Sequence, residues 1–454
     1  MIGIVGAGIT GLSLHHHLER RGVESTVFEA AAEPGGVLRT VHKDGHVLEC
    51  GPQRTRLTPV VHYLVESVGL NDRVVEAADV PLYVYNSGTL GRVPLSLRAA
   101  LTTDLLSWRG KLRVLLEPFV KPPQESETVD EYLTRAFGPE FATYVGGPLY
   151  AGLYASDPDE MPVEHSIRRA LDRFGIGRSV LFTLLRTQLK GRSPPPAVSF
   201  HNGMQELPRT LYERYSDNVS LNAPVRTIGE TDHGYELATD DTTTLVDEVV
   251  ITTPAPTAAS ILELISPDSA EALRDLTYNP LAIAHLHADA SFVGAGHQIP
   301  FADPYVTLGV TWNDSLFGRE SHTSPETSRA VSAATGREGV YTCFLGGAKT
   351  PDAVEWSDDR LGAIAATEFE EMTGVPAEPL HVHRLSLGMP AYDRSWDALR
   401  RVDPPAGIHL CANYESRAGI PGRVRQGKQL ATVLATDSEE VTRSEVPRYR
   451  AIRE

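Results

Sequence analysis

The pattern that most restricts how this chain can fold lies in its first 30 residues. An apolar run, Ile2–Val5, is typical of a buried parallel strand, and it is followed by glycines at positions 6, 8 and 11 with the spacing G-x-G-x-x-G. Residues 12–21 are expected to form a helix, and a second strand, Ser25–Phe28, is expected after it. These elements in this order predict a βαβ unit that binds a dinucleotide.

Each glycine of this turn has a separate physical role. Gly6 allows the tight turn out of the strand, Gly8 lets the backbone approach a pyrophosphate, and Gly11 lets the helix lie close to the sheet. The helix N-terminus adds unpaired N–H groups and the positive end of its dipole. Glu29, 18 residues after Gly11, is placed to accept hydrogen bonds from ribose hydroxyls. The cofactor is therefore expected to contact Gly6, Ala7, Gly8, Ile9, Thr10, Gly11 and Glu29.

A second glycine pair favours a flavin dinucleotide over a nicotinamide dinucleotide. Gly35 and Gly36 follow within seven residues of Glu29. NAD does not need such a pair, but it suits a loop that runs back past the pyrophosphate toward a flavin. Arg39 could place a fixed cation near a phosphate or the ring, and its alternative role is a solvated surface charge. The sequence therefore predicts FAD, held in part by Gly36, Val37 and Arg39.

The charge of the chain argues against nucleic acid as a partner. The formal net charge is −17 at pH 7, whereas a protein that binds a duplex needs a basic face to displace counterions. Segment 165–192 is a local exception because basic residues dominate it. That segment predicts either a solvated helical face or contact with an anionic substrate or membrane surface.

No group of cysteines or histidines has the spacing of a metal site. The cysteines lie far apart and are expected to be reduced, buried thiols at positions 50, 343 and 411. Consecutive helix residues point about 100° apart, so His15, His16 and His17 cannot converge on one ion and are expected to pack or to lie on the surface. No metal is predicted.

The N-terminus shows no signal peptide, because an apolar strand begins directly after Met1. No stretch approaches the roughly 18 consecutive apolar residues of a membrane span. A cytoplasmic protein is therefore expected, with peripheral contact at the inner membrane face left open.

Several blocks over nearly the whole chain resemble the flavin-containing amine oxidase superfamily, and within it the protoporphyrinogen/coproporphyrinogen oxidases. The opening through Arg39 resembles the family's FAD motif, and residues 49–52 (ECGP) resemble its E-x-G-P turn. The most discriminating block, residues 146–158 (GGPLYAGLYASDP), looks like the G-V-Y-A-G-D stretch of the porphyrinogen branch. Residues 200–208 (FHNGMQELP), 389–392 (MPAY) and 412–427 are similar to further family blocks.

The resemblance implies an α/β protein with a Rossmann-like FAD-binding domain that is discontinuous in sequence, a mixed-sheet substrate domain and a helical insertion. The FAD-binding domain is expected at residues 1–57, 197–260 and 405–436, and the substrate-binding domain at 58–95 and 261–404. Residues 96–196 would form the helical domain, where any membrane contact is expected, and 437–454 a C-terminal tail.

The resemblance also implies further site residues. Those expected to contact FAD are Gly51, Pro52, Gln53, Arg54, Val225, Trp396, Asn413, Ala418, Gly419 and Ile420. Arg54 and Arg56 are the candidates for substrate carboxylates, because guanidinium groups pair bidentately with propionates; their alternative is support of a surface or cofactor loop. The chain departs from the family where Gln53 replaces a frequent arginine and Asn413 replaces the usual acid.

The activity implied is that of an FAD-dependent oxidase that removes hydrides from a porphyrinogen, with oxygen as acceptor, in haem biosynthesis. Protoporphyrinogen IX and coproporphyrinogen III both remain open as substrates. No catalytic side chain is singled out, because flavin N5 carries the chemistry and the protein supplies binding and orientation.

Two other functions remain as alternatives. A flavin amine oxidase or a carotenoid-type desaturase shares the superfamily, and amine oxidases typically place a lysine near flavin N5. Lys349 is the one lysine considered for that role, and it is expected in a surface turn instead. The second alternative is an FAD-binding protein without catalytic activity.

Overall fold

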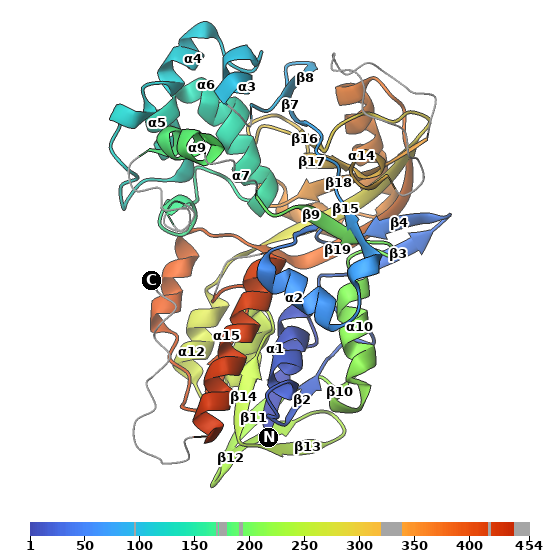
Figure 1. Ribbon diagram of the computed structural model, residues 1–454, viewed down its shortest axis with the longest axis vertical. Coiled ribbons are helices and arrows are strands. Elements are labelled where there is room, and N and C mark those ends of the chain that lie inside the picture. The colour runs from blue at the N-terminus through green and yellow to red at the C-terminus, as the bar shows by residue number, and fades with distance from the viewer. Residues whose placement is uncertain are drawn as a thin grey trace.

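Figure 1 shows the chain in a computed structural model, which describes residues 1–94, 97–168, 171, 179–189, 194–318, 338–415 and 419–439. A parallel five-stranded sheet lies in its lower part, a larger mixed sheet at upper right and a group of helices at upper left. The expected α/β architecture with a mixed sheet and a helical insertion is confirmed.

The five-stranded sheet has the order β10-β2-β1-β14-β20, and every neighbouring pair in it is parallel. Its strands come from three distant parts of the chain: β1 (Ile2–Val5), β2 (Ser25–Phe28), β10 (Val219–Ser220), β14 (Glu248–Ile251) and β20 (Ile408–Leu410). The predicted strands 2–5 and 25–28 are both confirmed, and such near-continuous apolar runs suit a parallel sheet that is covered on both faces.

Two helices from opposite ends of the chain pack side by side along this sheet (Figure 1). They are α1 (Ile9–Glu19) and α15 (Ile420–Glu439). A Cβ added at Gly427 of α15 would lie only 3.2 Å from the backbone nitrogen of Leu14, so a glycine permits this close approach. The helix predicted at 12–21 begins three residues earlier, at Ile9, directly after the glycine turn.

The larger sheet has seven strands in the order β19-β15-β18-β17-β16-β7-β8. Its neighbours are antiparallel except β16 and β7, which run parallel. The helix α14 (Asp358–Thr373) packs on it. The strand bounds are β7 (Leu82–Asn86), β8 (Thr89–Arg92), β15 (Tyr278–Ala288), β16 (Gly296–Gln298), β17 (Thr307–Trp312), β18 (Gly339–Gly346) and β19 (Glu378–Pro390).

The described part of segment 97–189 contains helices and no strand, as expected for the helical domain at 96–196. It contains α3 (Leu97–Thr102), α4 (Trp108–Val114), the 3-10 turn η2 (Glu117–Phe119), α5 (Val129–Phe137), α6 (Pro139–Phe141), α7 (Gly147–Tyr154) and α9 (Val180–Leu189). A π-helical turn, η3 (Ala142–Gly146), runs directly into α7. Turns of this kind are rare and are frequent at functional sites.

Smaller elements connect these parts. Two short sheets contain β3 (Thr40–Lys43) with β4 (His46–Glu49), and β5 (Thr55–Arg56) with β9 (Ala197–Phe200) and β6 (Val74–Glu76). A third contains β11 (Thr227–Thr231), β12 (Gly234–Ala238) and β13 (Thr243–Val246). The other helices and turns are α2 (Pro59–Ser67), η1 (Asn71–Arg73), α10 (Glu206–Arg214), η4 (Ser216–Asn218), α11 (Ala255–Leu262), α12 (Pro267–Arg274), α13 (Asn313–Phe317), η5 (Pro351–Glu355) and η6 (Arg394–Arg401).

The three consecutive histidines of α1 are buried, which confirms a packing role. The ring nitrogen Nδ1 of His15 lies 2.7 Å from Ser25 Oγ, and Nδ1 of His16 lies 2.8 Å from the Tyr215 hydroxyl. Burial is the main cause that lowers the pKa of His15 and His16 to about 4 and that of His17 to about 3. All three imidazoles are therefore neutral at pH 7.

These histidines predict that the fold loses stability in mild acid. Each pKa is lower in the folded chain than the ordinary 6.5, so the unfolded chain binds more protons between the two values. The stabilisation is complete above about pH 6.5 and falls as the pH drops toward 4, by at most about 3 kcal/mol for His15. Urea midpoints measured at pH 7.5 and pH 5 should show the loss.

Another buried histidine, outside α1, provides a control for this prediction. His297 is buried against Trp312 with 5.9 Å between ring centroids, and burial lowers its pKa to about 3. His297→Leu removes one of the groups that must be protonated, so the difference between the two midpoints should shrink. An unchanged midpoint in the unsubstituted protein from pH 7.5 to pH 5 would contradict the explanation.

Candidate cofactor site

Three glycine-containing loops meet at the N-terminus of α1. The amide of Gly35 donates a hydrogen bond of 2.9 Å to the carbonyl of Ala7, and Gly35 pairs with Gly8 in an isolated parallel bridge. A Cβ on Gly51 would lie 1.9 Å from the carbonyl oxygen of Val37, so only glycine fits there. The first loop, the Gly35–Gly36 pair and the E-C-G-P turn therefore form one continuous backbone surface, which we call the glycine cradle.

The glycine cradle has space for a ligand at Gly8 but not at Gly11. A Cβ on Gly8 would have no atom within 4 Å, whereas one on Gly11 would lie 2.0 Å from the carbonyl oxygen of Gly6. Gly36, Val37, Arg39 and Pro52 are exposed around the same surface. Bare backbone at a helix N-terminus beside open space is the arrangement that binds a pyrophosphate, so these residues fit a dinucleotide.

Glu29 lies at the end of β2 and holds the first loop. Its two carboxylate oxygens accept hydrogen bonds from the amides of Ala7, at 2.6 Å, and Ala31, at 2.9 Å. The carbonyl of Glu29 also accepts from the amide of Ala223, at 2.8 Å, which brings the segment before β11 close to it. Val225 belongs to that segment. A carboxylate has about four acceptor positions, so Glu29 keeps capacity for sugar hydroxyls.

The carboxylate of Glu49 joins the E-C-G-P turn to two neighbouring segments. Its buried carboxylate accepts hydrogen bonds from the Thr40 hydroxyl, at 2.8 Å, and from the amide of Met204, at 2.9 Å. Gly203 has φ +90, and a Cβ there would lie 2.9 Å from Glu49 Oε1. The blocks 35–40, 49–52 and 200–204, which the resemblance singles out separately, are therefore joined by one carboxylate.

The side-chain amide of Gln53 is hydrogen-bonded within the protein and does not face an open surface. Its amide nitrogen donates to the carbonyls of Glu49, at 3.1 Å, and Gly51, at 3.0 Å, so both of its N–H groups have partners. Its oxygen accepts a hydrogen bond of 2.9 Å from Asn313, which in turn accepts one from Thr342. The side chain expected to contact FAD instead holds the turn against α13 and β18.

The two candidate substrate arginines lie in different surroundings. Arg54 is accessible to solvent, yet desolvation by the surrounding protein lowers its pKa, with a smaller contribution from Arg56. The Arg54 side chain is therefore partly surrounded by protein although it keeps access to solvent. Arg56 is exposed on β5 and donates a hydrogen bond of 3.0 Å to the carbonyl of Pro195.

The most discriminating sequence block meets the M-P-A-Y segment. The Ser156 hydroxyl donates a hydrogen bond of 2.6 Å to the carbonyl of Ala391, and Asn279 Nδ2 donates to the same hydroxyl at 2.7 Å. Ala155 and Tyr392 both have positive φ, at 51° and 56°. Such values are uncommon outside glycine and cluster at functional sites.

Trp396 does not reach the glycine cradle as an exposed ring. Only 2% of the residue is accessible, and its ring lies 4.1 Å from that of Tyr392, centroid to centroid. His165, also buried, lies 6.1 Å from it. The structure therefore gives Trp396 a packing role beneath Tyr392, where the resemblance had predicted a flavin contact.

The block at residues 412–427 lies at the same end of the five-stranded sheet as the glycine cradle. The Tyr278 hydroxyl donates a hydrogen bond of 2.9 Å to Asn413 Oδ1 and accepts one of 3.1 Å from the amide of Ala255. Gly419, with φ +105, precedes Ile420, the first residue of α15. Ala418 lies outside the described residues.

Arg423 is a buried arginine whose burial could not be predicted from the sequence. It lies in the first turn of α15, is 6% exposed, and has its pKa lowered by burial. Nothing in the local sequence distinguishes this arginine from a surface one, because the partners that bury it come from other segments.

Lys349 corrects the expectation of a surface turn. The residue is half-buried, and its Nζ has no access to solvent and no hydrogen-bond partner within the described chain. The ammonium lies 5.8 Å from the centroid of the Phe301 ring, and burial lowers its pKa although Asp303 and Glu368 oppose the shift. These neighbours belong to the loop before β17 and to α14, not to the glycine cradle.

Comparisons with known proteins agree with this geometry. A profile of the family described as "Flavin containing amine oxidoreductase" matches residues 9–435. The chain is 25% identical to protoporphyrinogen oxidase 2, chloroplastic/mitochondrial, of Arabidopsis thaliana, over 98% of this chain and 96% of that protein. It is 24% identical to coproporphyrinogen III oxidase of Bacillus subtilis (strain 168), over 94% of this chain and 96% of that protein.

Solved structures show the same fold. A crystal structure named "Putative protoporphyrinogen oxidase", from Exiguobacterium sp. 255-15, superposes with a TM-score of 0.79 at 24% identity, over 96% of this chain and 98% of that one. Putrescine oxidase superposes with a TM-score of 0.65 at 17% identity, over the same shares. These likenesses extend over both sheets and the helical segment.

Proposed function

Because this chain belongs to the flavin containing amine oxidoreductase family and is an FAD-dependent oxidoreductase, we propose that its substrate is a porphyrinogen, oxidised to the porphyrin with oxygen as the final electron acceptor. The observation that carries the proposal is the end-to-end likeness to protoporphyrinogen and coproporphyrinogen oxidases. The position of Arg54, open to solvent yet partly surrounded by protein, supports it, because every porphyrinogen of this pathway carries carboxylates that a guanidinium can bind.

The residues of this chain would bind the cofactor and orient the reacting groups. When bound, FAD supplies the capacity to accept hydrides from carbon. The bare backbone at Gly8 and the N-terminus of α1 would hold its pyrophosphate, and Glu29 its ribose. Glu49 and Gln53 hold the turn that borders the site in one position, so that the reacting atoms keep a fixed geometry.

Arg54 would orient the substrate through a carboxylate. Arg54→Leu should raise KM for the porphyrinogen about 10- to 100-fold, the value of a charged hydrogen bond of roughly 1.5–3 kcal/mol, while flavin content stays unchanged. Arg56→Leu is the matched comparison and should have the smaller effect, because its guanidinium already binds the Pro195 carbonyl. Equal kinetics for Arg54→Leu and the unsubstituted enzyme would show that Arg54 does not bind substrate.

An aerobic assay with both porphyrinogens tests the function itself, with porphyrin fluorescence as the readout. Putrescine and other primary amines serve as the competing substrate class, with peroxide as the readout. Porphyrin formation without amine turnover is expected. Peroxide formed only with amines would replace the proposal with an amine oxidase, and a flavin that no substrate reduces anaerobically would favour a protein without catalytic activity.

We also propose that the helical segment touches a membrane surface. Five large apolar side chains of α4, η2 and the two residues between them are exposed, from 49% for Leu115 to 86% for Phe119; the others are Trp108, Leu112 and Leu116. We call them the α4 face. Exposed Arg109 and half-buried Lys111 lie on the same helix, which suits anionic headgroups. Within the described chain, no helix combines the length and apolar character that crossing a bilayer requires.

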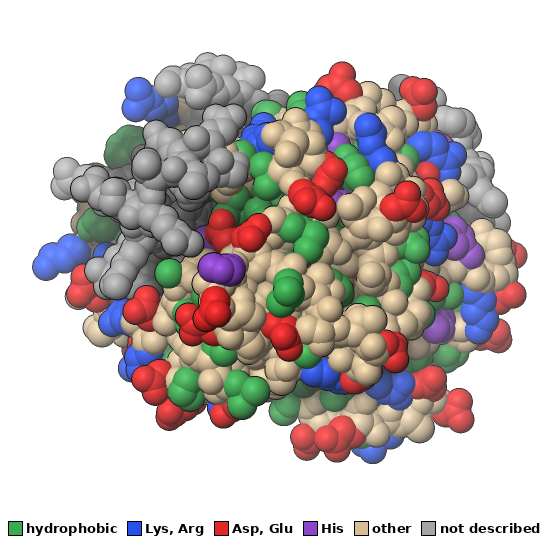
Figure 2. All heavy atoms as spheres, turned by 90° about the horizontal axis from the view of Figure 1, so that it is seen from below, with side chains coloured by type: hydrophobic (Ala, Val, Ile, Leu, Met, Phe, Trp, Pro, Cys, Tyr) green, Lys and Arg blue, Asp and Glu red, His purple; other side chains and the backbone are tan. Residues whose placement is uncertain are grey.

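Vesicle binding tests the α4 face. A protein with both Trp108→Ser and Phe119→Ser should bind anionic phospholipid vesicles at least about 10-fold more weakly, because two large apolar groups no longer enter the interface. Leu264→Ser with Val293→Ser is the control, since these side chains are 73% and 67% exposed at other places. If the unsubstituted protein and both double variants sedimented equally with vesicles, the α4 face would not be the membrane-binding surface. Figure 2 views the molecule from below, the side opposite α4 in Figure 1, and there acidic and basic side chains mix without a continuous basic area.

A further inference from the structure

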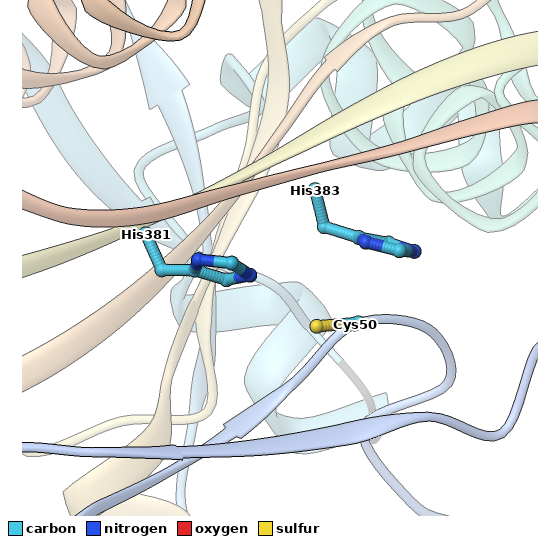
Figure 3. Close-up of side chains that lie close together, drawn as sticks. All are labelled: Cys50, His381 and His383. Atoms are coloured by element: carbon cyan, nitrogen blue, oxygen red, sulfur yellow. The ribbon is translucent and has the colours of Figure 1, made fainter. Parts of the chain in front are cut away.

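Three metal-ligating side chains from opposite parts of the chain come together beside the E-C-G-P turn (Figure 3). They are Cys50, which follows β4, and His381 and His383 on β19. One ligand atom from each, the Cys50 Sγ and a ring nitrogen of each histidine, lies within 4.8 Å of the other two. More than 300 residues separate the cysteine from the histidines in the sequence.

Strand geometry explains how the chain builds this cluster. Residues two apart on a strand point to the same face, so His381 and His383 project from the same side of β19 (Figure 3). The β3–β4 hairpin, which leads into the turn with Cys50, is held against the seven-stranded sheet by two hydrogen bonds. His285 Nε2 lies 3.1 Å from the carbonyl of Glu49, and Lys43 Nζ donates to the carbonyl of Leu380 at 2.6 Å.

The protein itself leaves these ligands available. The Nε2 atom of His381 is buried without a hydrogen-bond partner in the described chain, although buried polar atoms usually have one. Burial is the first cause that lowers the pKa of His381 and of His383, so both imidazoles are neutral at pH 7. The Cys50 sulfur makes one weak contact, 3.9 Å from the carbonyl of Leu48.

We propose that Cys50, His381 and His383 bind one zinc ion, or a similar borderline-soft divalent ion, with the fourth position left to water or an anion. One thiolate and two imidazoles are a ligand set that Zn²⁺ favours, and three protein ligands leave a position open. Tetrahedral bonds of about 2.0–2.3 Å place ligand atoms roughly 3.5 Å apart. Each pair of ligand atoms therefore has to close by at most about 1.3 Å, within the range of small rotations about the χ angles.

The surroundings of the site act on metal binding in opposite directions. Burial raises the pKa of the Cys50 thiol to about 12, so binding at pH 7 releases one proton as the thiol becomes a thiolate. The guanidinium of Arg39 lies close enough to lower the pKa of Cys50, and of both histidines. It disfavours a bare dication, but it favours the thiolate, and the thiolate neutralises one charge of the ion.

The consequence is a metal-crosslinked junction between the cofactor turn and the seven-stranded sheet. The ion would join Cys50 to β19 of the seven-stranded sheet. Cys50 directly follows Glu49, whose carboxylate fixes the glycine cradle. This inference is independent of the proposed substrate, because it needs neither a porphyrinogen nor turnover. Two other clusters, Glu164 with His165 and Asp397, and His287 with Asp289 and Glu338, offer partly exposed carboxylates in place of a thiol.

Equilibrium dialysis of the flavin-loaded protein against Zn²⁺ tests the site, with elemental analysis of zinc per chain. The unsubstituted protein should retain one equivalent after exchange into metal-free buffer, and Cys50→Ala, His381→Gln and His383→Gln should each retain at least 10-fold less. Cys343→Ala and His287→Gln are the matched controls, since they remove another buried cysteine and another candidate cluster. Zinc lost in His287→Gln or kept in Cys50→Ala would overturn the proposal.

A measurement without substitutions guards against variants that fail to fold. Co²⁺ added to the flavin-loaded protein should produce a tetrahedral absorption at wavelengths longer than the flavin bands, together with release of one proton. Subsequent Zn²⁺ should abolish that absorption and raise the melting temperature. The absence of any cobalt band, or an octahedral one without thiolate character, would overturn the proposal whatever the variants do.

Discussion

Replacing Gly8 by valine should give a folded protein that holds no flavin. A Cβ at this position meets no protein atom within 4 Å, and the residue's φ of −70° is one that valine adopts readily. The protein alone therefore tolerates the side chain, and only a pyrophosphate against the backbone would be displaced. We expect at least about 100-fold weaker flavin binding, or roughly 3 kcal/mol, measured as the flavin-to-protein absorbance ratio after supplying excess FAD.

Gly229→Val is the control for this result. Gly229 lies on β11, far along the chain from the glycine cradle, and its added Cβ would make only an ordinary contact of 3.8 Å with Glu236. It should keep full flavin content. If Gly8→Val purified with full flavin, the pyrophosphate would not lie at this turn, and the roles given to Glu29 and the helix N-terminus would have to be abandoned as well.

Replacing Gly11 by alanine, only three residues later, should damage the fold itself. Its Cβ would lie 2.0 Å from the carbonyl oxygen of Gly6, a backbone atom that no side-chain rotation can move away. Either α1 moves off the sheet or the turn opens, and both disturb the contact of α1 with α15. A cost of several kcal/mol is expected, as for a severely overpacked core position.

The measurement is the urea midpoint of the flavin-free protein, which separates folding from cofactor binding. Gly11→Ala should lower that midpoint strongly or prevent recovery of folded protein, whereas Gly8→Val should leave it within error of the unsubstituted chain. Two variants of one six-residue motif would then fail for different reasons. A Gly11→Ala protein with an unchanged midpoint would mean that α1 packs less closely on the turn than the structure shows.

Other residues show where local pattern stops being informative. The expected flavin contact at Gln53 depends on its place in the E-C-G-P block, but its amide is fully used by Glu49, Gly51 and Asn313. The surface turn expected for Lys349 fails because its ammonium is buried close to the Phe301 ring. The partners Asn313 of Gln53 and Phe301 of Lys349 come from other segments of the chain, and no spacing rule contains that information.

The sequence by itself determined the opening βαβ unit and the demand for glycine at positions 6, 8 and 11. These features follow from steric and periodic rules that act over a few neighbouring residues, so they can be recognised in a string of letters. The wider α/β architecture, with its mixed sheet and helical segment, was expected from the resemblance of several blocks to a known family. The burial of Trp396 against Tyr392, the partly desolvated surroundings of Arg54 and the meeting of Cys50 with β19 were decided only by the tertiary structure. Each is a contact between distant segments, and packing of whole sheets and helices against one another sets which distant segments meet.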